Sequence, residues 1–205
     1  LQVIVVYTLT TAGAWRIDYE ATAVDAATPV NLTQHVYFNL RDGGKHTIDE
    51  HVMQIHAASI TAVDEALMPT GEVKNIEDTI FDFRTPKPIG QDLKKVGNTP
   101  VGFDHNYVID GEPGTLRTAA EVYEPHSGRV MTVATTEPAM QFYCGNFLDG
   151  TVTGHDGYAY KQHTGFCLET QHYPDAPNQP TFPSIILHAG KTYRSTTEYR
   201  FSVRA

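Results

Sequence analysis

The chain has 205 residues, of which 40% are hydrophobic, and this is long enough for one well-buried domain. It carries 15 Lys and Arg against 24 Asp and Glu, a formal charge of −9, which argues against a nucleic-acid partner because phosphate binding needs an excess of basic residues. No apolar run approaches the roughly 18–20 residues that span a bilayer, and there is no signal peptide, so we expect no membrane association. The two cysteines, Cys144 and Cys167, make no disulfide framework, which favours a reduced, cytoplasmic chain.

The first residues predict a hairpin. The chain opens directly on LQVIVVYTL, a strand-like run without an initiator Met. WRIDYEATA (15–23) alternates apolar and polar side chains, which predicts a half-buried antiparallel strand. Thr-Ala-Gly at 11–13 supplies the turn, so residues 1–23 are predicted to pair. Because native domains seldom begin inside a sheet, we interpret the chain as a fragment that lacks an upstream part.

The rest of the chain also predicts strands. Residues 116–125 and 129–138 form a second predicted hairpin around His-Ser-Gly, and only residues 89–97 offer a helical turn or two. Further strands are predicted at 139–147, 165–170, 183–189 and 191–203. The 16 Gly and 12 Pro are spread throughout, as suits short strands joined by turns. The sequence therefore predicts one all-β domain over residues 1–205, a large antiparallel β-sandwich.

Four stretches place polar or ionisable groups in aromatic, strand-like surroundings. These are NLTQHVYFNL (31–40) with His35 beside Tyr37, VGFDHNYVI (101–109) with Asp104, MQFYCGNF (140–147) with Gln141, and CLETQ (167–171) with Glu169. Aromatic rings that stack on the C–H faces of a sugar, with carboxylates and amides that hold its hydroxyls, are typical of a carbohydrate site.

Each of these residues also has a purely structural interpretation. His35 could be a hydrogen-bonded core histidine, and Asp104 could cap a turn through its own backbone. Glu169 fits a structural role less well, because it ends an apolar run and has no basic residue near it in sequence. Gln141 taken alone is uninformative.

The sequence does not favour a metal, a phosphate or a covalent nucleophile. His51 and His56 are five residues apart, no HxH or HExxH spacing occurs, and the histidines near Glu169 lack a second acidic ligand. Cys167 lies in a predicted strand without the Gly-rich turn or adjacent base that activates a thiol. There is no Gly-rich phosphate loop and no GxSxG elbow. We therefore predict no metal and no cofactor.

Taken together, these stretches resemble the aldose 1-epimerase family, the galactose mutarotases, in a bacterial form. The resemblance covers nearly the whole chain and includes, in this order, TPVNLTQHVYFNL, MPTGE, FDFR, GFDHNY, MQFYCGNF and LETQHYPDAPN. It implies the galactose mutarotase-like supersandwich fold. It also implies that His35 is the general acid and Glu169 the general base, with Asp104, Gln141 and Tyr37 as substrate-binding residues. The chain departs from the family pattern at Gln34 and Val36, where Asn and Ser are frequent.

The activity that the resemblance implies is interconversion of the α and β anomers of a hexose such as galactose or glucose. A carboxylate and an imidazolium would open and close the ring by acid–base catalysis, without a metal, a nucleotide or a covalent intermediate. Family members carry, upstream, an Arg in an RxANRI-type motif and a second His in an LHGG-type motif, and neither motif is in this chain. We therefore interpret residues 1–205 as the C-terminal two-thirds of a longer mutarotase domain.

Two alternatives and one association remain open at this point. The chain could be a glycoside hydrolase that uses Asp104 and Glu169, which would need the two carboxyls about 5–5.5 Å or 6.5–9.5 Å apart. It could also be a carbohydrate-binding sandwich without turnover. An exposed sheet edge at Leu1–Leu9 would invite self-association, with a homodimer as the simplest form.

Overall fold

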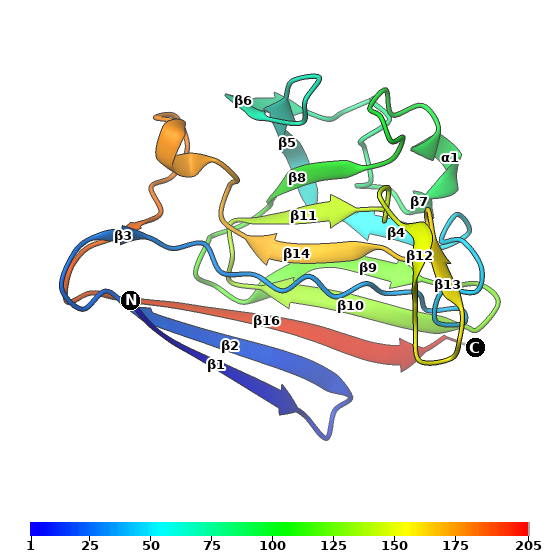
Figure 1. Ribbon diagram of the computed structural model, residues 1–205, viewed down its shortest axis with the longest axis horizontal. Helices are drawn as coiled ribbons and strands as arrows, with labels where there is room; N and C mark the ends of the chain where they lie inside the picture. The colour runs from blue at the N-terminus through cyan, green and yellow to red at the C-terminus, as the bar shows by residue number, and fades with distance from the viewer. Residues whose placement is uncertain (205) are drawn as a thin grey trace.

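The protein is built almost entirely from antiparallel strands. The computed structural model describes residues 1–204, and its strands form two main sheets (Figure 1). The larger sheet has seven strands, in the order β1 (Gln2–Leu9), β2 (Ala14–Thr22), β16 (Thr192–Val203), β10 (Arg129–Thr135), β9 (Arg117–Tyr123), β4 (Val52–Ile55) and β7 (Lys87–Pro88). The second sheet has five, in the order β14 (Cys167–Gln171), β11 (Ala139–Tyr143), β8 (Asp104–Ile109), β5 (Ala57–Val63) and β6 (Pro69–Asn75).

Smaller elements complete the chain. Two short pairs join β12 (Asp149–Thr153) to β13 (Ala159–Lys161), and β3 (Thr28–Pro29) to β15 (Ile186–Leu187). The helices are a single turn, α1 (Gly90–Leu93), and the 3-10 turn η1 (Ala176–Asn178). Two packed antiparallel sheets with hardly any helix confirm the predicted all-β sandwich. None of the helices in the described residues is long and apolar enough to cross a membrane.

The hydrophobic core lies between the two sheets, because each sheet turns one face of alternating apolar side chains toward the other. Ile17 from β2 and Tyr199 from β16 meet Phe142 from β11 and Tyr107 from β8 in one cluster of buried residues. Full burial of such a side chain is worth about 1.5–3 kcal/mol relative to leaving it in water. The core thus fixes which face of β14, β11 and β8 is left for a site.

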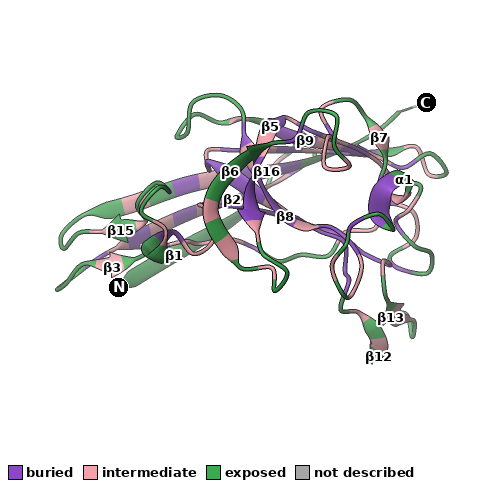
Figure 2. Ribbon diagram, turned by 90° about the horizontal axis from the view of Figure 1, so that it is seen from above, coloured by how far each residue is buried: buried purple, intermediate pink, exposed green. Residues whose placement is uncertain are grey.

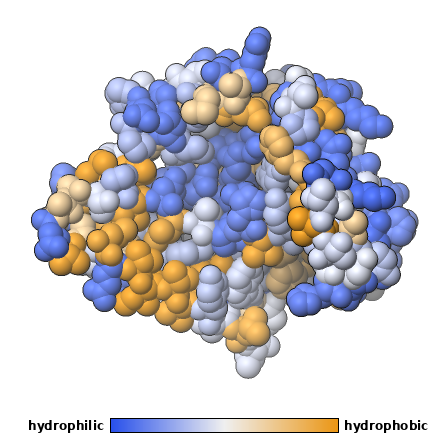
Figure 3. Space-filling model, in the orientation of Figure 1, coloured by the Kyte–Doolittle hydropathy of each residue, from blue (hydrophilic) through white to orange (hydrophobic). Residues whose placement is uncertain are grey.

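The predicted N-terminal hairpin is confirmed. β1 and β2 pair from Gln2 opposite Thr22 to Leu9 opposite Trp15. In β2 the apolar positions of the alternation are the more buried ones. β1, in contrast, is exposed along its whole length (Figure 2), and its Val, Ile and Leu side chains contribute to a hydrophobic area at the lower left of Figure 3. β1 therefore leaves both faces and one edge open.

Three stretches are less regular than their sequences indicate. Residues 31–40 form no strand, and only Phe38 makes an isolated bridge, to Phe166. The strand predicted at 139–147 ends at Tyr143, because Gly145 takes a positive φ of 64° and turns the chain. The strand predicted at 183–189 is reduced to Ile186–Leu187. In each case a local turn or side-chain bond replaces ladder pairing.

Candidate active site

Two polar rows run across the face of the five-stranded sheet that points away from the core. In the antiparallel ladders, Gln141 on β11 lies opposite both Glu169 on β14 and Asn106 on β8. Two residues away, Tyr143 lies opposite Cys167 and Asp104. Directly opposed residues and residues two apart on a strand share one face of a sheet. Chain segments far apart in sequence therefore bring their polar side chains to one surface.

The orientation of the strand that carries Glu169 is set by the side chain on its core-facing side. Leu168 is fully buried in the core, and the whole of β14 is buried. Period-two alternation then points Cys167 and Glu169 away from the core and into the concave side. The carboxylate is only 8% exposed as a residue, so it is held in a nearly dry setting. This placement is why a strand of apolar and small residues can carry an acid.

The turn before Asp104 requires glycine. Gly102 has a φ of 144°, and a Cβ there would lie 1.9 Å from Oδ1 of Asn146. The amide of Asn98 holds both polar groups of Gly102, donating to its carbonyl at 2.8 Å and accepting from its N–H at 3.0 Å. This closed turn sets the first residue of β8, which is Asp104.

His35 comes from the irregular segment that crosses beside β14 (Figure 1) and not from a strand. Its neighbour Gln34 is buried and fastens this segment, since Nε2 donates to the carbonyl of Leu168 at 2.9 Å and contacts the hydroxyl of Tyr199. The Gln34 side chain also accepts a hydrogen bond from the N–H of Val36 at 2.6 Å. Gln34 therefore ties the residues on both sides of His35 to the strand of Glu169.

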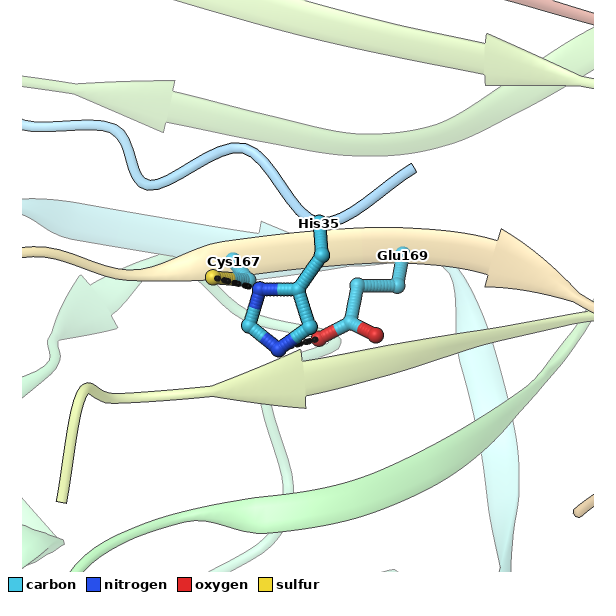
Figure 4. A group of neighbouring side chains, drawn as sticks. All are labelled: His35, Cys167 and Glu169. Carbon is cyan, nitrogen blue, oxygen red and sulfur yellow. Dashed lines mark hydrogen bonds and ion pairs between the residues drawn. The ribbon is translucent and has the colours of Figure 1, made fainter. Parts of the chain in front are cut away.

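The imidazole of His35 lies between the side chains of Cys167 and Glu169 (Figure 4). Nε2 is 3.4 Å from Oε1 of Glu169, and Nδ1 is 3.4 Å from Sγ of Cys167. The ring of Tyr37 is tilted against the His35 ring at a centroid distance of 5.1 Å. One ring nitrogen therefore faces the carboxylate, while the other is held by a thiol.

These side chains open into a cavity of about 360 Å³, large enough for one small ligand. In it, Nε2 of Gln141 donates a hydrogen bond of 2.6 Å to Oδ1 of Asp104. The lining residues are His35, Tyr37, Asp104, Gln141, Tyr143, Phe147, Glu169, Gln171 and Pro174. In Figure 3 a hollow with hydrophilic walls lies in the middle of the corresponding face. Rings and polar groups together match the requirements of a sugar.

Burial sets the electrostatics of the cavity. The pKa of Glu169 is raised to about 7, mainly by burial, which the positive charge of His35 opposes and the negative charge of Asp104 reinforces. Burial also raises the pKa of Asp104, against the hydrogen bond from Gln141. A carboxyl whose pKa lies near neutrality can both accept and return a proton, which is the property of a general base.

His35, Cys167 and Glu169 also form a group whose ligand atoms lie within 4.8 Å of one another. Two features make this group a poor metal centre. Burial raises the pKa of the Cys167 thiol, whereas a metal needs the thiolate. In addition, Cys167 and Glu169 face different nitrogens of one ring, which point in different directions. The arrangement suits hydrogen bonding better than a shared ion.

A second cavity, of about 780 Å³, adjoins the first at Tyr37 and is the larger one. Its wall is mainly apolar, with Phe38, Leu148 and Phe201 among its residues. The charged Arg129 in it already donates hydrogen bonds to the backbone carbonyls of Leu40 and Arg41. With little free polar capacity, this cavity suits apolar packing, so we assign the chemistry to the smaller, polar one.

Comparison with known proteins decides the family. The sequence model of the family described as aldose 1-epimerase matches residues 1–200. The chain belongs to the aldose 1-epimerase family. Within it, the chain is 47% identical over 203 residues to the galactose mutarotases of Bos taurus and Homo sapiens, covering 99% of this chain and 58% of each relative. It is 40% identical over 204 residues to the aldose 1-epimerase of Escherichia coli, covering 95% of this chain and 57% of that protein.

Solved structures agree with the family. An aldose epimerase homologue from C. elegans has a TM-score of 0.84 at 28% identity, covering 98% of this chain and 59% of that one. A galactose 1-epimerase from Lactobacillus acidophilus has a TM-score of 0.81 at 24% identity, which shows the common fold. The chain thus spans somewhat more than half the length of the relatives that it matches.

The fold brings all the residues singled out in the sequence, His35, Tyr37, Asp104, Gln141 and Glu169, to one cavity. Sequence reasoning missed four other wall residues: Tyr143, Phe147, Gln171 and Pro174. Two of them had a readable signal, because Tyr143 follows Gln141 by two residues and Gln171 follows Glu169 by two, which places each pair on one strand face. The other two follow the ends of β11 and β14, where periodicity gives no information.

Proposed function

We propose that this epimerase family member interconverts the α and β anomers of an aldose, with a hexose such as galactose or glucose as substrate. The observation that supports it most is the contact between His35 and Glu169 in a polar cavity that also holds Asp104 and Gln141. The relatives named galactose mutarotase and aldose 1-epimerase add support, although the chain spans only 57–58% of their length.

The chemistry follows from an acid and a base beside one ring. Glu169 removes the proton from the C1 hydroxyl, while protonated His35 delivers a proton to the ring oxygen. The C1–O5 bond breaks as the carbonyl forms, and the open-chain aldehyde results. Rotation about C1–C2 presents the other carbonyl face, and the same two groups exchange roles as the ring closes. Each proton transfer is worth roughly 10²–10⁴ in rate.

The other side chains have binding roles in this proposal. Asp104 and Gln141 hold sugar hydroxyls, because a carboxylate accepts and an amide both donates and accepts. Tyr37 offers a ring face and edge beside the imidazole, 5.1 Å away between centroids. Cys167 contacts Nδ1 of His35 and so favours an orientation in which Nε2 faces the substrate.

The test is the relaxation of freshly dissolved α-D-galactose, followed by polarimetry. We expect the chain to raise the rate above that of buffer. Because relatives are longer, the same measurement should include a chimaera that adds the unmatched part of the E. coli relative. A sugar-binding module would bind galactose but leave both rates unchanged. Release of phenol from an aryl galactoside would instead favour a glycoside hydrolase that uses Asp104 and Glu169.

We also propose a reducing compartment, the cytoplasm, for this activity. Cys144 and Cys167 are both buried free thiols that form no disulfide, as is usual where thiols are kept reduced. Fractionation of the source cells, with detection by antibody, would test the location. Recovery in an oxidising compartment would contradict it.

Self-association through β1 is a further part of the proposal. β1 pairs with β2 alone, so its other edge presents unpaired backbone groups beside exposed Val and Ile side chains. We expect light scattering to show a dimer, and Val5→Lys to weaken it. A monomer at all concentrations would contradict this assignment.

A further inference from the structure

A small polar cavity, of about 130 Å³, lies next to the sugar pocket on the same sheet face. The two cavities share Asp104, Gln141 and Pro174. Thr61 and Asn106 line the part of the small cavity that the sugar pocket does not include, and apolar residues around the β5–β6 turn complete it. The question is what this space holds.

The strand register explains how the cavity is connected to the catalytic carboxylate. Glu169, Gln141 and Asn106 are successive cross-strand neighbours on β14, β11 and β8, which lie side by side in Figure 1. Ile60 on β5 lies opposite Tyr107 on β8, and the residues next to them, Thr61 and Asn106, line the same small cavity. One polar row therefore extends from Glu169 across four strands.

The far end of this row has unmet hydrogen-bonding capacity. Asn106 is 2% exposed and Thr61 is 1% exposed, and neither the amide of Asn106 nor the hydroxyl of Thr61 has a protein partner. Oε1 of Gln141, whose Nε2 is bonded to Asp104, is also buried without one. Buried polar groups without partners cost free energy, and native structures nearly always satisfy them. Donors and acceptors at this spot therefore call for a polar occupant.

The lining chemistry limits the occupant to an uncharged group. An amide and a hydroxyl both donate and accept, which matches a sugar hydroxyl. No basic side chain lines the cavity, and the carboxyl of Asp104 would repel a phosphate or a carboxylate. The volume is too small for a second sugar ring but sufficient for a short arm. Two strand spacings, roughly 10 Å, separate the backbones of Glu169 and Asn106, a distance that a hexose with its exocyclic hydroxyls can span.

We propose that Asn106 and Thr61 form a subsite for a hydroxylated, uncharged arm of the aldose, carried on a carbon other than C1. This inference rests on the proposed function, because it requires the sugar to occupy the adjoining pocket with C1 at Glu169. The subsite makes Asn106 and Thr61 specificity residues that bind one hydroxyl and take no part in proton transfer.

The experiment is a double-mutant cycle in which one change removes a hydroxyl from the sugar and the other removes a polar side chain from the protein. The relaxation rates of D-galactose and of its 2-, 3-, 4- and 6-deoxy analogues are measured with the wild type, Asn106→Leu and Thr61→Val. In the wild type, loss of the hydroxyl that enters the subsite should lower kcat/KM about tenfold or more. Asn106→Leu should lower kcat/KM for galactose by a similar factor. In this variant, the analogue that lacks the subsite hydroxyl should then react as fast as galactose, while the other three analogues keep their wild-type ratios to galactose. We call the ratio of kcat/KM for galactose to that for an analogue the penalty of that analogue. Thr61→Val should reduce the penalty for the same analogue.

Controls separate a subsite from damage to the fold. Thr132→Val changes a partly exposed threonine on β10, in the other sheet, and should leave all five rates unchanged. The pH below which kcat/KM falls should be the same in Asn106→Leu as in the wild type, because Asn106 contacts neither His35 nor Glu169. If Asn106→Leu does not fold, the near-isosteric Thr61→Val still tests the cycle.

The outcomes distinguish this inference from the proposed function. Deoxy penalties that are the same in the wild type and both variants would overturn the subsite and indicate that the cavity holds about four ordered waters. If the wild type does not accelerate relaxation, the proposed function fails, and the same cycle is run with dissociation constants from calorimetry. A single matching penalty there would support the subsite alone. No binding of any of the sugars would overturn both.

Discussion

Nε2 of His35 lies 3.4 Å from Oε1 of Glu169, although one residue belongs to an irregular segment and the other to a buried strand. The His35 side chain is 53% exposed and that of Glu169 is 11% exposed. The pair therefore has one member that solvent can reach and one that it hardly can. A sugar that lies over the pair would meet a carboxylate and an imidazole at neighbouring atoms.

The first prediction concerns the base. Glu169→Gln keeps the shape and one acceptor but cannot take a proton, so kcat for galactose should fall by roughly 10²–10⁴ while binding persists. Polarimetry gives the rate, and calorimetry gives the affinity. Glu121→Gln is the matched control, because that glutamate pairs with Arg204 at the surface of the other sheet. More than about a tenth of the wild-type rate in Glu169→Gln would contradict the base assignment.

The second prediction is the pH dependence. Since burial raises the pKa of Glu169 to about 7, kcat/KM should fall as the pH drops through that value, well above the ordinary range of a carboxyl. The charge of Asp104 contributes to the rise, so Asp104→Asn should move the acid limb to lower pH. The check is a kcat/KM profile from pH 4 to 9. A limb that stays in place in Asp104→Asn would show that the two carboxyls do not interact.

The third prediction separates binding from proton transfer. Asp104 is proposed to hold hydroxyls, so Asp104→Asn should raise KM more than it lowers kcat. Loss of a charged acceptor should cost about 1.5–3 kcal/mol, which corresponds to roughly 10–100-fold in KM. If instead kcat fell as far as in Glu169→Gln with KM unchanged, Asp104 would take part in proton transfer. That result would support the glycoside hydrolase alternative.

The fourth prediction concerns Gln34, which fastens the segment of His35. Gln34→Ala removes its bonds to Leu168 and Val36, so His35 should lose its fixed position and kcat should fall about tenfold or more. The acid limb of the pH profile should stay, since Glu169 remains. Gln54→Ala serves as the control, because it removes one similar bond, to the carbonyl of Arg84. Equal losses in both variants would indicate a general loss of stability.

The fifth prediction is that ionised Glu169, the proposed base, lowers the stability of the fold at alkaline pH. The pKa of Glu169 is higher in the folded chain than in the unfolded one, so the folded state binds the proton more tightly. The resulting stability is complete below the unfolded value near 4.3 and is lost as the pH rises toward 7. Glu169→Gln should therefore raise the free energy of unfolding by about 1–3 kcal/mol at pH 8 and hardly change it at pH 4. Urea denaturation at both pH values measures this. A variant less stable at pH 8 would contradict it.

The sequence predicts the strands of this fold where one face is buried and the other is not. Residues 15–23 show this best, because the alternation of Ile17 and Asp18 is the alternation of core and solvent. β4, β5, β6 and the β12–β13 hairpin escaped prediction. β5 is largely buried, whereas β6 and β12 are largely exposed. None of these three strands therefore shows a clean alternation of buried and exposed side chains.

The site could be predicted only in part for a similar reason. Glu169 and Gln141 stand out by their chemistry, but nothing local shows that they are cross-strand neighbours, because register depends on long-range pairing. The segment of His35 looks strand-like, yet the side chains of Gln34 and Asn39 bond to backbone groups and replace ladder pairing there. The unpartnered amide of Asn106 is a property of packing alone.

The pairing of β2 with β16 has a consequence for how this chain is made. The ladder joins Thr22 to Thr192 and Ala14 to Arg200, so β2 finds its second neighbour only when residues 192–200 have been synthesised. At about 5–20 residues per second, the hairpin waits roughly ten to thirty seconds with the core face of β2 uncovered. Sheets closed by such distant pairing also form slowly. The yield of folded chain therefore depends on what protects Ile17 and Tyr19 during that interval, so slower synthesis at low temperature or a holding chaperone should raise it.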